Sequence, residues 1–385
     1  MIKQFLFFAF HLILLSACAQ ESNQLNIDAE KEVEVPKIEI NIDAYLQEVP
    51  ELDAKVDSIL ATMSDEAIVA QLIMPAVGRF GQKEDTIKAL IEAHLIGGVL
   101  LLNGTMEQCS DWTSTFNAMN KEYNNLPFLY SADAEPSLVN RKIKGSTIVP
   151  RANQIKDSLE AVSVSKTIST DLNAIGINYN FSPVVDLAKN STVGYRGFAA
   201  NPKNVIPFSQ AFILQSQSQN IISTAKHFPG HGLVSGDTHK SLQVIDGELK
   251  ELKYYPPLIE TGVLSIMVAH IAIQNNVLFD TKGMPSTISE VIVQDLLRDS
   301  LNFKGLIVTD AMNMGGVSKI KNASSLAISA GCDILLMPLN ARKAHHEILL
   351  KYQTDEIFNA KVILAAKRII RMKICIEMNC MNKLL

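Results

Sequence analysis

One short stretch of the sequence is dense in side chains that can bind polar groups and move protons. A basic, histidine-rich run is followed closely by an aspartate and a third histidine: Lys226-His227-Phe228-Pro229-Gly230-His231-Gly232 and then Asp237-Thr238-His239. The carboxylate of Asp237 is close enough in sequence to hold the imidazole of His239 in place, which suits a proton donor. The apolar run 221–225 directly before this stretch is typical of a buried strand that delivers polar groups at its carboxyl end.

The same basic residues could also be metal ligands. Lys226, His227 and His231 would then share an ion. A lysine at a strand end and a proline-glycine turn suit the recognition of hydroxyl groups and carboxylates better than they suit zinc. We therefore predict no metal and no other cofactor.

Composition and charge exclude several classes of protein. The 385 residues are 47% hydrophobic and 19% charged, so the chain can bury a large core and is not a disordered polyelectrolyte. A formal net charge of −5 lacks the electrostatic signature of a nucleic-acid binder, so no nucleic-acid partner is expected. A neutral or acidic small substrate fits this balance, provided that local positive groups meet it.

Short apolar runs alternate with longer helix-like stretches from about residue 68 onward. We predict strands within the runs 69–74, 98–102, 128–131, 177–181, 221–225, 265–269, 306–309 and 333–337. We predict helices over 84–94, 108–122, 156–174, 204–218, 289–300, 323–330 and 354–372. Continuous apolar strands separated by helices indicate a parallel sheet that is covered on both faces, and eight such units predict an α/β fold of a single TIM-type (β/α)8 barrel. An open doubly wound sheet is disfavoured because no glycine fingerprint follows the first strand.

Polar residues that follow the predicted strands should converge on one mouth of such a barrel. They are Asp133, Asp186, Lys226, His227, His270 and Asp310, and the loops add Arg141, Arg196 and His239. Several of them have other interpretations: Asp310 could cap a helix, and the arginines could lie on the surface. His270 fits a core histidine as well as a functional one, and Asp186 is more readily a tie between loops than a substrate contact.

The amino terminus resembles a targeting segment. Lys3 precedes the apolar run 5–15, and Leu15-Ser16-Ala17-Cys18 closes it in the manner of a bacterial lipoprotein signal with Cys18 as the lipidation site. An ordinary secretory signal is the alternative. We predict a signal peptide over 1–18, a polar linker over 19–43, the barrel over 44–373 and a tail over 374–385. The protein would then be exported to the cell envelope, in the outer membrane or periplasm, and touch a membrane through its lipid anchor only.

The other cysteines have neither the density of a disulfide scaffold nor the spacing of a metal site. We expect buried or incidental thiols at Cys109, Cys332, Cys375 and Cys380.

The histidine-rich stretch is similar to the signature of the β-N-acetylglucosaminidases of glycoside hydrolase family 3. Supporting stretches follow in that family's order and extend the resemblance over about residues 50–373. They are 133–141, Asn180-Phe181-Ser182-Pro183-Val184-Val185-Asp186, Tyr195-Arg196-Gly197-Phe198, Ala269-His270 and Val308-Thr309-Asp310-Ala311-Met312.

The resemblance implies a role for each of the polar residues. Asp310 would be the nucleophile, His239 the general acid and then base, and Asp237 the group that orients His239. Asp133, Arg141, Arg196, Lys226 and His227 match sugar-binding positions, and His270 is placed with them. The implied activity is that of a retaining exo-β-N-acetylglucosaminidase that removes terminal N-acetylhexosamine from cell-wall-type glycans, which are then the carbohydrate partner.

Two alternatives stay open. A histidine acid/base leaves room for an anionic acceptor, as a β-N-acetylglucosaminide phosphorylase would need. The segment 134–140 departs from the family pattern, since Pro136 removes a backbone donor and fixes φ. A catalytically impaired sugar-binding lipoprotein is therefore the second alternative.

Overall fold

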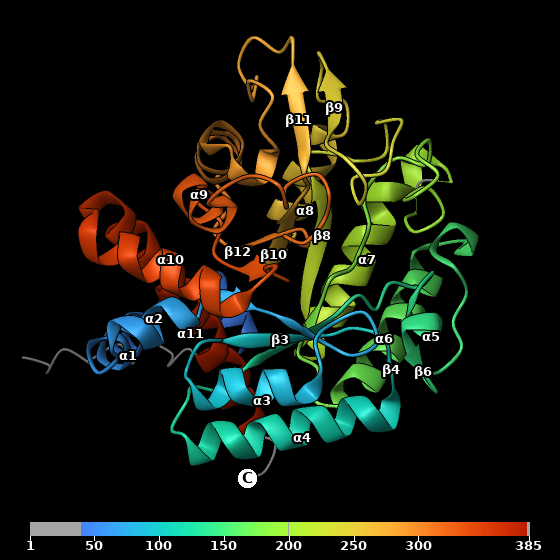
Figure 1. Cartoon of the computed structure of the whole chain (residues 1–385). Coiled ribbons are helices and arrows are strands. Elements are labelled where there is room, and N and C mark those ends of the chain that lie inside the picture. Colours follow the sequence, from blue (N-terminus) through green and yellow to red (C-terminus); the bar gives the residue numbers. More distant parts are fainter. Residues whose placement is uncertain (1–39, 199, 383–385) are drawn as a thin grey trace, which may run out of the picture. The chain divides into compact units, whose positions relative to one another are not determined.

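The structure is a computed structural model that describes residues 40–382 except residue 199, with the side chains of 378–382 outside the description. Figure 1 shows the chain coloured along its sequence. The predicted signal peptide, Cys18 and most of the predicted linker lie outside the described residues.

Short parallel strands separated by helices form the centre of the fold (Figure 1). Seven of them pair in the order β12-β10-β8-β7-β5-β3-β2, which follows the chain from last to first. Two further strands, β1 and β13, pair in parallel with each other, and an isolated bridge joins Val308 of β12 to Ile334. The bounds of these nine strands are β1 Ile73–Met74, β2 Ala76–Val77, β3 Gly98–Leu101, β5 Leu129–Ala132, β7 Tyr179–Asn180, β8 Ile222–Phe228, β10 Ser265–Val268, β12 Leu306–Thr309 and β13 Leu335–Leu336.

The predicted α/β class with parallel strands is confirmed, and each predicted apolar run contains a strand. The first run differs most from its prediction. Asp65–Ala70 forms the helix α2, so only the end of the run is extended as β1. Pro75 then separates β1 from β2, because proline has no N–H to donate to a neighbouring strand. The Pro75 carbonyl still accepts a hydrogen bond from Leu100 N at 2.9 Å.

The predicted helices are present with shifted ends. Six are α-helices, and the predicted helix over 289–300 is a π-helix, η6 (Val291–Ser300). The six are α3 Glu84–Glu92, α4 Met106–Glu122, α6 Ser158–Ala174, α7 Val205–Ser218, α9 Ala323–Ala330 and α11 Glu356–Asn382. Sequence reasoning missed α1 Pro50–Ala61, α2, α5 Val139–Lys142, α8 Tyr255–Glu260 and α10 Ala341–Thr354.

The missed helix α10 illustrates why. Its buried residues, Ala341, Ala344, His345, Ile348 and Tyr352, follow helical spacing, but only one of them is a large aliphatic residue. The apolar periodicity that signals a helix is therefore weak in this segment.

Both predicted boundaries of the barrel fall inside ordered structure. The helix α11 continues past residue 373 to Asn382 and buries Cys375, so the predicted tail begins within a helix. At the other end the short helix η1 (Ile42–Leu46) buries Ile42, inside the predicted linker. Arg371 of α11 ties the two ends together by donating through Nε to Tyr45 O at 2.9 Å.

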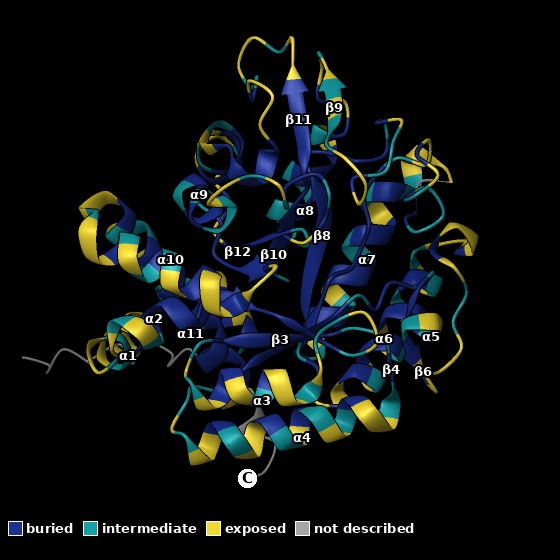
Figure 2. Ribbon diagram, in the orientation of Figure 1, coloured by how far each residue is buried: buried dark blue, intermediate teal, exposed yellow. Residues whose placement is uncertain are grey.

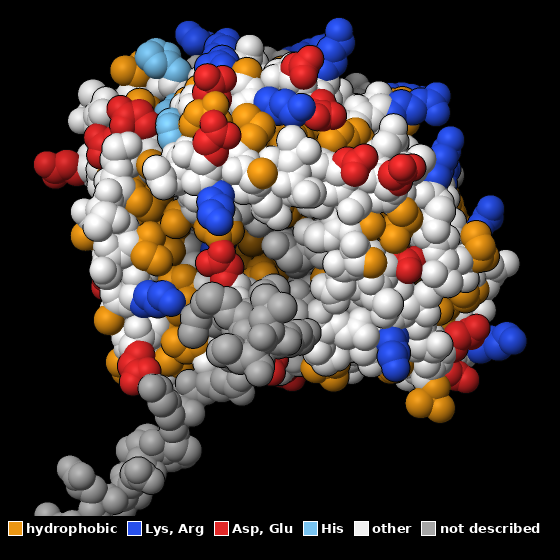
Figure 3. All heavy atoms as spheres, turned by 90° about the horizontal axis from the view of Figure 1, so that it is seen from below, with side chains coloured by type: hydrophobic (Ala, Val, Ile, Leu, Met, Phe, Trp, Pro, Cys, Tyr) orange, Lys and Arg blue, Asp and Glu red, His pale blue; other side chains and the backbone are white. Residues whose placement is uncertain are grey.

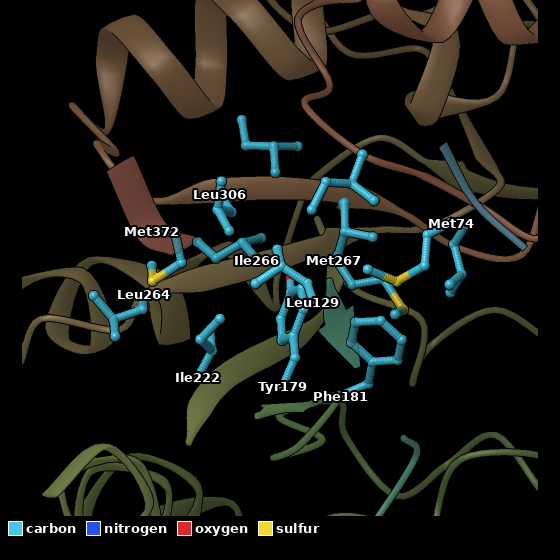
Figure 4. Packing of buried hydrophobic residues seen from close by; sticks show 14 of the residues in the cluster. Met74, Leu129, Tyr179, Phe181, Ile222, Leu264, Ile266, Met267, Leu306 and Met372 are labelled. Atoms are coloured by element: carbon cyan, nitrogen blue, oxygen red, sulfur yellow. The ribbon is translucent and has the colours of Figure 1, made fainter. Parts of the chain in front are cut away.

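The central strands and the inward faces of the helices are buried, whereas the outward faces of the helices are exposed (Figure 2). Side chains from several strands interlock there, with Met74, Leu129, Tyr179, Ile266 and Leu306 among the residues drawn in Figure 4. The Tyr179 hydroxyl, which could be unsatisfied at this depth, lies 2.6 Å from Ser265 Oγ. Cys109, Cys332 and Cys375 are buried free thiols, as predicted, and the side chain of Cys380 is outside the description.

Two more parallel pairs lie outside the central strands. They are β4 (Gly104–Thr105) with β6 (Ile143–Lys144), and β9 (Gln243–Asp246) with β11 (Ile271–Gln274). Among the described residues, no helix has the length and apolar character needed to cross a membrane.

Candidate active site

A cavity of about 1130 Å³ opens at the carboxyl ends of the central strands. Its lining includes residues that directly follow β3, β5, β12 and β13, as well as the end of β8. Seven of the sequence-predicted site residues line it: Asp133, Arg141, Arg196, Lys226, His227, His239 and Asp310. The structure therefore brings together residues that lie up to 177 positions apart, from Asp133 to Asp310.

Lys226 and His227 are neighbours in β8, yet both line the cavity. Side chains of successive strand residues normally point to opposite faces of a sheet. The pairing of β8 with β10 is irregular at this point, because Met267 lies opposite Lys226 whereas Val268 lies opposite Phe228. This bulge leaves His227 as an extra residue and allows both side chains to face the cavity.

Four buried or half-buried charges form a connected network beside the cavity. Lys226 Nζ contacts Asp133 Oδ1 at 2.8 Å and Glu135 Oε1 at 2.7 Å. Arg196 binds the same glutamate with two hydrogen bonds, Nε to Oε2 at 2.9 Å and Nη2 to Oε1 at 2.6 Å. The sequence does not single out Glu135, because it lies in the segment 134–140, which departs from the family pattern.

Burial disfavours the charged forms of the groups in this network, but their oppositely charged partners stabilise those forms by more. Burial raises the pKa of Asp133, yet Lys142 and Lys226 hold it well below its usual value. Burial likewise raises the pKa of Glu135, but Arg196 and Lys226 lower it by more, so that the net pKa is about 2. The pKa of Lys226 is lowered by burial but raised overall by the two carboxylates. All three groups are therefore ionised at neutral pH.

The short helix α5 carries Lys142, a basic residue that the sequence does not single out and that contacts Asp133. Lys142 Nζ lies 2.5 Å from Asp133 Oδ2. The predicted residue Arg141 also lines the cavity, but it is exposed and pairs with no carboxylate among residues 40–382 that the structure describes.

Asp186 has the structural role that the sequence favoured. Its carboxylate is fully buried and accepts from His227 Nδ1 at 2.6 Å and from His231 N at 2.8 Å. Asp186 does not line the cavity. It fixes the ring of His227 through Nδ1, so that Nε2 remains as the nitrogen available to a ligand.

The glycine-rich turn after β8 packs closely against a second buried acid, Glu251. A Cβ on Gly232 would lie 2.1 Å from Leu187 O and 2.6 Å from Glu251 Oε1, so only glycine fits there. Glu251 Oε1 in turn accepts from Leu187 N at 2.6 Å. Burial, followed by the charge of Asp186, raises the pKa of Glu251 to about 8.

Asp237 and His239 form the predicted carboxylate–imidazole pair. Asp237 Oδ1 accepts from His239 Nδ1 at 2.7 Å and from His239 N at 3.0 Å. The imidazole is well exposed to solvent, with 59% of its side chain accessible. Because Nδ1 is occupied, Nε2 is the atom that can exchange a proton with a ligand.

The loop that carries this pair is anchored beneath the exposed imidazole. Thr238 is buried, and its Oγ1 lies 2.9 Å from His231 Nε2. Gly315 N donates to His239 O at 2.9 Å, which ties the loop to the segment that follows Asp310. A Cβ on Gly315 would lie 2.3 Å from Lys240 O, so a glycine is required for this close approach.

Asp310 follows β12 and faces the same cavity. Ala311 N donates to its Oδ1 at 2.8 Å. Burial raises the pKa of Asp310, but His227, His270 and the Ala311 N–H lower it below its usual value overall. A carboxylate held in this way is ionised and has its second oxygen available for attack.

His270 adopts the core position that the sequence left open, rather than the substrate-binding position in which the family resemblance placed it. It is fully buried, and both ring nitrogens are engaged, Nδ1 with Thr287 Oγ1 at 2.8 Å and Nε2 with Ala311 O at 3.0 Å. It does not line the cavity. The structure thus places His270 behind the Asp310 segment, where it supports Ala311.

The donor set fits a carbohydrate better than a metal ion. Within the described part of the chain, no group of three or more histidines, cysteines or carboxylates is arranged to hold a metal. The cavity instead presents a carboxylate, a solvent-accessible imidazole and several charged hydrogen-bonding groups. Such a set can form and break a glycosidic bond.

Comparison with known proteins agrees with this chemistry. Residues 64–372 match the family described as "Glycosyl hydrolase family 3 N terminal domain". The "Beta-hexosaminidase" of Nitrosomonas eutropha is 30% identical over 296 residues, which cover 70% of this chain and 81% of that protein. That of Hydrogenovibrio crunogenus is 29% identical over 293 residues, covering 70% and 79%.

Solved structures give the same family. A glycoside hydrolase family 3 beta-N-acetylglucosaminidase from Paenibacillus sp. has a TM-score of 0.76 at 25% identity, over 83% of this chain and 64% of that one. A Beta-N-acetylhexosaminidase from Beutenbergia cavernae has a TM-score of 0.74 at 27% identity, over 81% and 99%. The chain thus spans about two thirds of the first protein and nearly all of the second. It belongs to glycosyl hydrolase family 3 and is a glycoside hydrolase.

Proposed function

We propose that this glycoside hydrolase is a retaining exo-β-N-acetylglucosaminidase that acts through a covalent glycosyl-enzyme. One observation carries the proposal: an ionised carboxylate, Asp310, and an imidazole held by a carboxylate, His239 with Asp237, line the same cavity. A retaining glycosidase needs such a nucleophile together with a separate proton donor. The relatives named beta-hexosaminidase support the choice of an N-acetylhexosamine as the sugar.

The reaction assigns one role to each side chain. The free oxygen of Asp310 attacks the anomeric carbon while His239 Nε2 donates its proton to the leaving oxygen, and the glycosidic bond breaks. His239 then removes a proton from water, which attacks the same carbon and releases Asp310. Asp237 acts throughout by holding Nδ1, and so fixes the ring orientation and the tautomer.

The charged network would bind the sugar that is cleaved. Asp133 accepts hydrogen bonds from hydroxyl groups, and Arg196, Lys226 and His227 donate them, with Arg141 at the rim of the cavity. Glu135 does not line the cavity but fixes Arg196 and Lys226 from below. His270 supports the Asp310 segment in this account rather than touching substrate.

The proposal includes a closed eight-fold barrel as the scaffold. The bridge from Val308 to Ile334 links the seven-strand sheet to the β1–β13 pair on one side. On the other side, Gly97 N donates to Ile73 O at 3.1 Å, which links β1 to the neighbourhood of β3. These contacts support a ring of strands around one core.

The proposal also retains the cellular address that the sequence predicts. The enzyme would be exported and lipid-anchored through Cys18, with glycans of the cell envelope such as peptidoglycan fragments as substrates. Mass spectrometry of the protein purified from membranes tests this: a lipidated amino-terminal Cys18 is expected, and an unmodified, soluble mature chain would contradict it.

A phosphorylase is the second candidate, because the cavity is rich in basic residues that could attract inorganic phosphate. Its lining contains Arg79, Arg141, Lys142, Lys144, Arg196 and Lys226, against the carboxylates of Asp133 and Asp310. Phosphate could then replace water in the second step and yield the sugar 1-phosphate.

The test is hydrolysis of 4-nitrophenyl N-acetyl-β-glucosaminide and 4-nitrophenyl β-glucoside by the full chain, with and without phosphate. We expect release from the acetamido sugar only, with free N-acetylglucosamine as the product at every phosphate concentration. A phosphate-dependent sugar 1-phosphate would establish the phosphorylase instead. No turnover by a folded protein would favour a sugar-binding role, for which the altered segment 134–140 is the first suspect.

A further inference from the structure

Lys142 is an extra cation in the charged network beside the cavity. Without it, the carboxylates of Asp133 and Glu135 are matched by Lys226 and Arg196, which contact them directly. The network is therefore already balanced in charge. Lys142 adds a third positive group to the same connected cluster, at 2.5 Å from Asp133 Oδ2.

The position of Lys142 leaves it more accessible to a ligand than Lys226. Both lysines line the cavity, but the Lys226 side chain is 1% exposed and contacts two carboxylates, whereas the Lys142 side chain is 18% exposed and contacts one. An ammonium group has three N–H donors, and only one is directed at Asp133. The others can reach a group that binds next to Asp133.

The surroundings of Lys142 strengthen its positive field. Arg79, Arg141 and Lys144 line the same cavity, and none of the three pairs with a carboxylate in the described part of the chain. The chain as a whole carries a formal net charge of −5, and the face in Figure 3 shows acidic and basic side chains interspersed. The cavity lining carries six basic residues against two carboxylates, and a concave site with such a positive excess concentrates negatively charged ligands.

We propose that Lys142 contacts the substrate and adapts the subsite of Asp133 to a terminal sugar that carries a negatively charged ester, a phosphate or a sulfate. Asp133 accepts from a hydroxyl group of that sugar while Lys142 donates to the neighbouring anion. This proposal rests on the proposed hydrolase function, because it specifies the sugar that the same cavity cleaves.

The experiment compares 4-nitrophenyl N-acetyl-β-glucosaminide with the same compound bearing a phosphate or a sulfate ester on O3, O4 or O6. The full chain is assayed in phosphate-free buffer, beside Lys142→Met, Lys142→Arg and Lys121→Met. Methionine keeps the length of the side chain without its charge. Lys121 is an exposed lysine on α4 outside the cavity and serves as the control for a change in net charge.

We expect the wild type to prefer at least one charged probe to the neutral one by about tenfold in kcat/KM, as a charge-assisted hydrogen bond would give. Lys142→Met should lose that preference, mainly through KM, while Lys142→Arg keeps most of it. Lys121→Met should leave the ratio at the wild-type value. Whether the phosphate or the sulfate probe is preferred identifies which ester the subsite takes.

Three outcomes would overturn the proposal. The first is that the wild type cleaves only the neutral probe. The second is that Lys142→Met lowers kcat/KM for the neutral and the charged probes by the same factor, as it would if Lys142 only held α5 to Asp133. The third is that Asp310→Asn, used as a binding-only form in calorimetry, binds N-acetylglucosamine and each of its phosphate and sulfate esters with equal affinity. Failure of the hydrolase function is distinguishable, since a folded wild type would then cleave no probe at all.

Discussion

Two clusters of buried charge lie at opposite ends of the central strands. At the carboxyl ends, Asp133 and Glu135 hold Lys226 and Arg196; at the amino ends, Asp333 holds Arg298 and Arg368 just before β13. Both clusters pair carboxylates with basic groups away from solvent. Only the first borders the cavity, because Asp333, Arg298 and Arg368 are all absent from its lining.

The partners of the two clusters explain the difference. Arg298 Nη1 donates to Phe303 O at 3.0 Å and to Gly305 O at 2.6 Å, and Asp333 also accepts from Ile307 N at 2.7 Å. These contacts tie the starts of β12 and β13 together. Lys226 and Arg196 instead hold their carboxylates on one side and face the cavity on the other. Strand direction, rather than burial or charge, separates a binding network from a structural one.

The largest expected effect is on catalysis at the carboxyl ends. Asp310→Asn removes the nucleophile but keeps the size of the side chain, so kcat should fall by at least about 10³-fold. The melting temperature should stay within a few degrees of the wild type, because Asp310 forms no ion pair among the described residues. Steady-state kinetics and thermal melting measure the two. Substantial remaining turnover would remove Asp310 from the nucleophile's role.

The opposite pattern is expected at the amino ends. Asp333→Asn leaves Arg298 and Arg368 without their carboxylate, and breaking a buried ion pair costs about 3–5 kcal/mol of unfolding free energy. Urea denaturation should show this loss, while kcat of the folded fraction remains near the wild-type value. A stable but inactive Asp333→Asn would show that the division between the two ends is wrong.

Glu135→Gln tests whether the cavity network combines both properties. The pKa of Glu135 is about 2 against an ordinary value of 4.5, so its ionised form stabilises the fold above pH 4.5, and this contribution is lost as the pH falls from 4.5 toward 2. The shift corresponds to a contribution of about 3 kcal/mol. The variant should therefore show a shallower loss of stability over that range than the wild type.

The same variant should also bind sugar less well, because Arg196 and Lys226 lose the group that positions them. We expect KM to rise about tenfold with a smaller change in kcat. Glu135→Asp, which keeps the charge but shortens the reach, should restore part of the acid stability. An unchanged KM in Glu135→Gln would make Glu135 a stabilising residue only.

For activated substrates, the smallest effect is expected at the exposed pair of Asp237 and His239. Asp237→Asn weakens the bond that orients His239, so cleavage of substrates with poor leaving groups should slow by about tenfold or more, while activated aryl substrates change little. The slope of log kcat against the pKa of the leaving group measures this. Equal losses for all leaving groups would argue against proton donation by His239.

Much of this arrangement could be predicted from the sequence. Residues at the ends of apolar runs converge because parallel strands carry their carboxyl ends to one edge, and Asp133, Lys226, His227 and Asp310 follow that rule. The pattern of apolar runs does not predict the direction in which a side chain at a strand end points. His270 follows β10 and fits the rule equally well, yet its ring turns away to Thr287 and Ala311.

Other features depend on contacts that a sequence does not encode locally. The role of Glu135 follows from its contacts with Arg196 and Lys226, which are distant from it in the chain. Lys142 rather than its neighbour Arg141 reaches Asp133, because the four-residue helix α5 sets which side chain faces inward. The helix α11 extends past its predicted end since Cys375 and Ile376 pack into the core.

The most direct test of the proposed roles is rescue by azide of Asp310→Ala and His239→Ala acting on an activated N-acetyl-β-glucosaminide. Without the nucleophile, azide must attack the β-linked substrate directly and give the α-glycosyl azide. Without the acid/base, Asp310 still forms the glycosyl-enzyme, and azide then displaces it to give the β-glycosyl azide. We predict the α-azide from Asp310→Ala and the β-azide from His239→Ala, both identified by NMR. A β-azide from Asp310→Ala would contradict the assignment of Asp310 as the nucleophile.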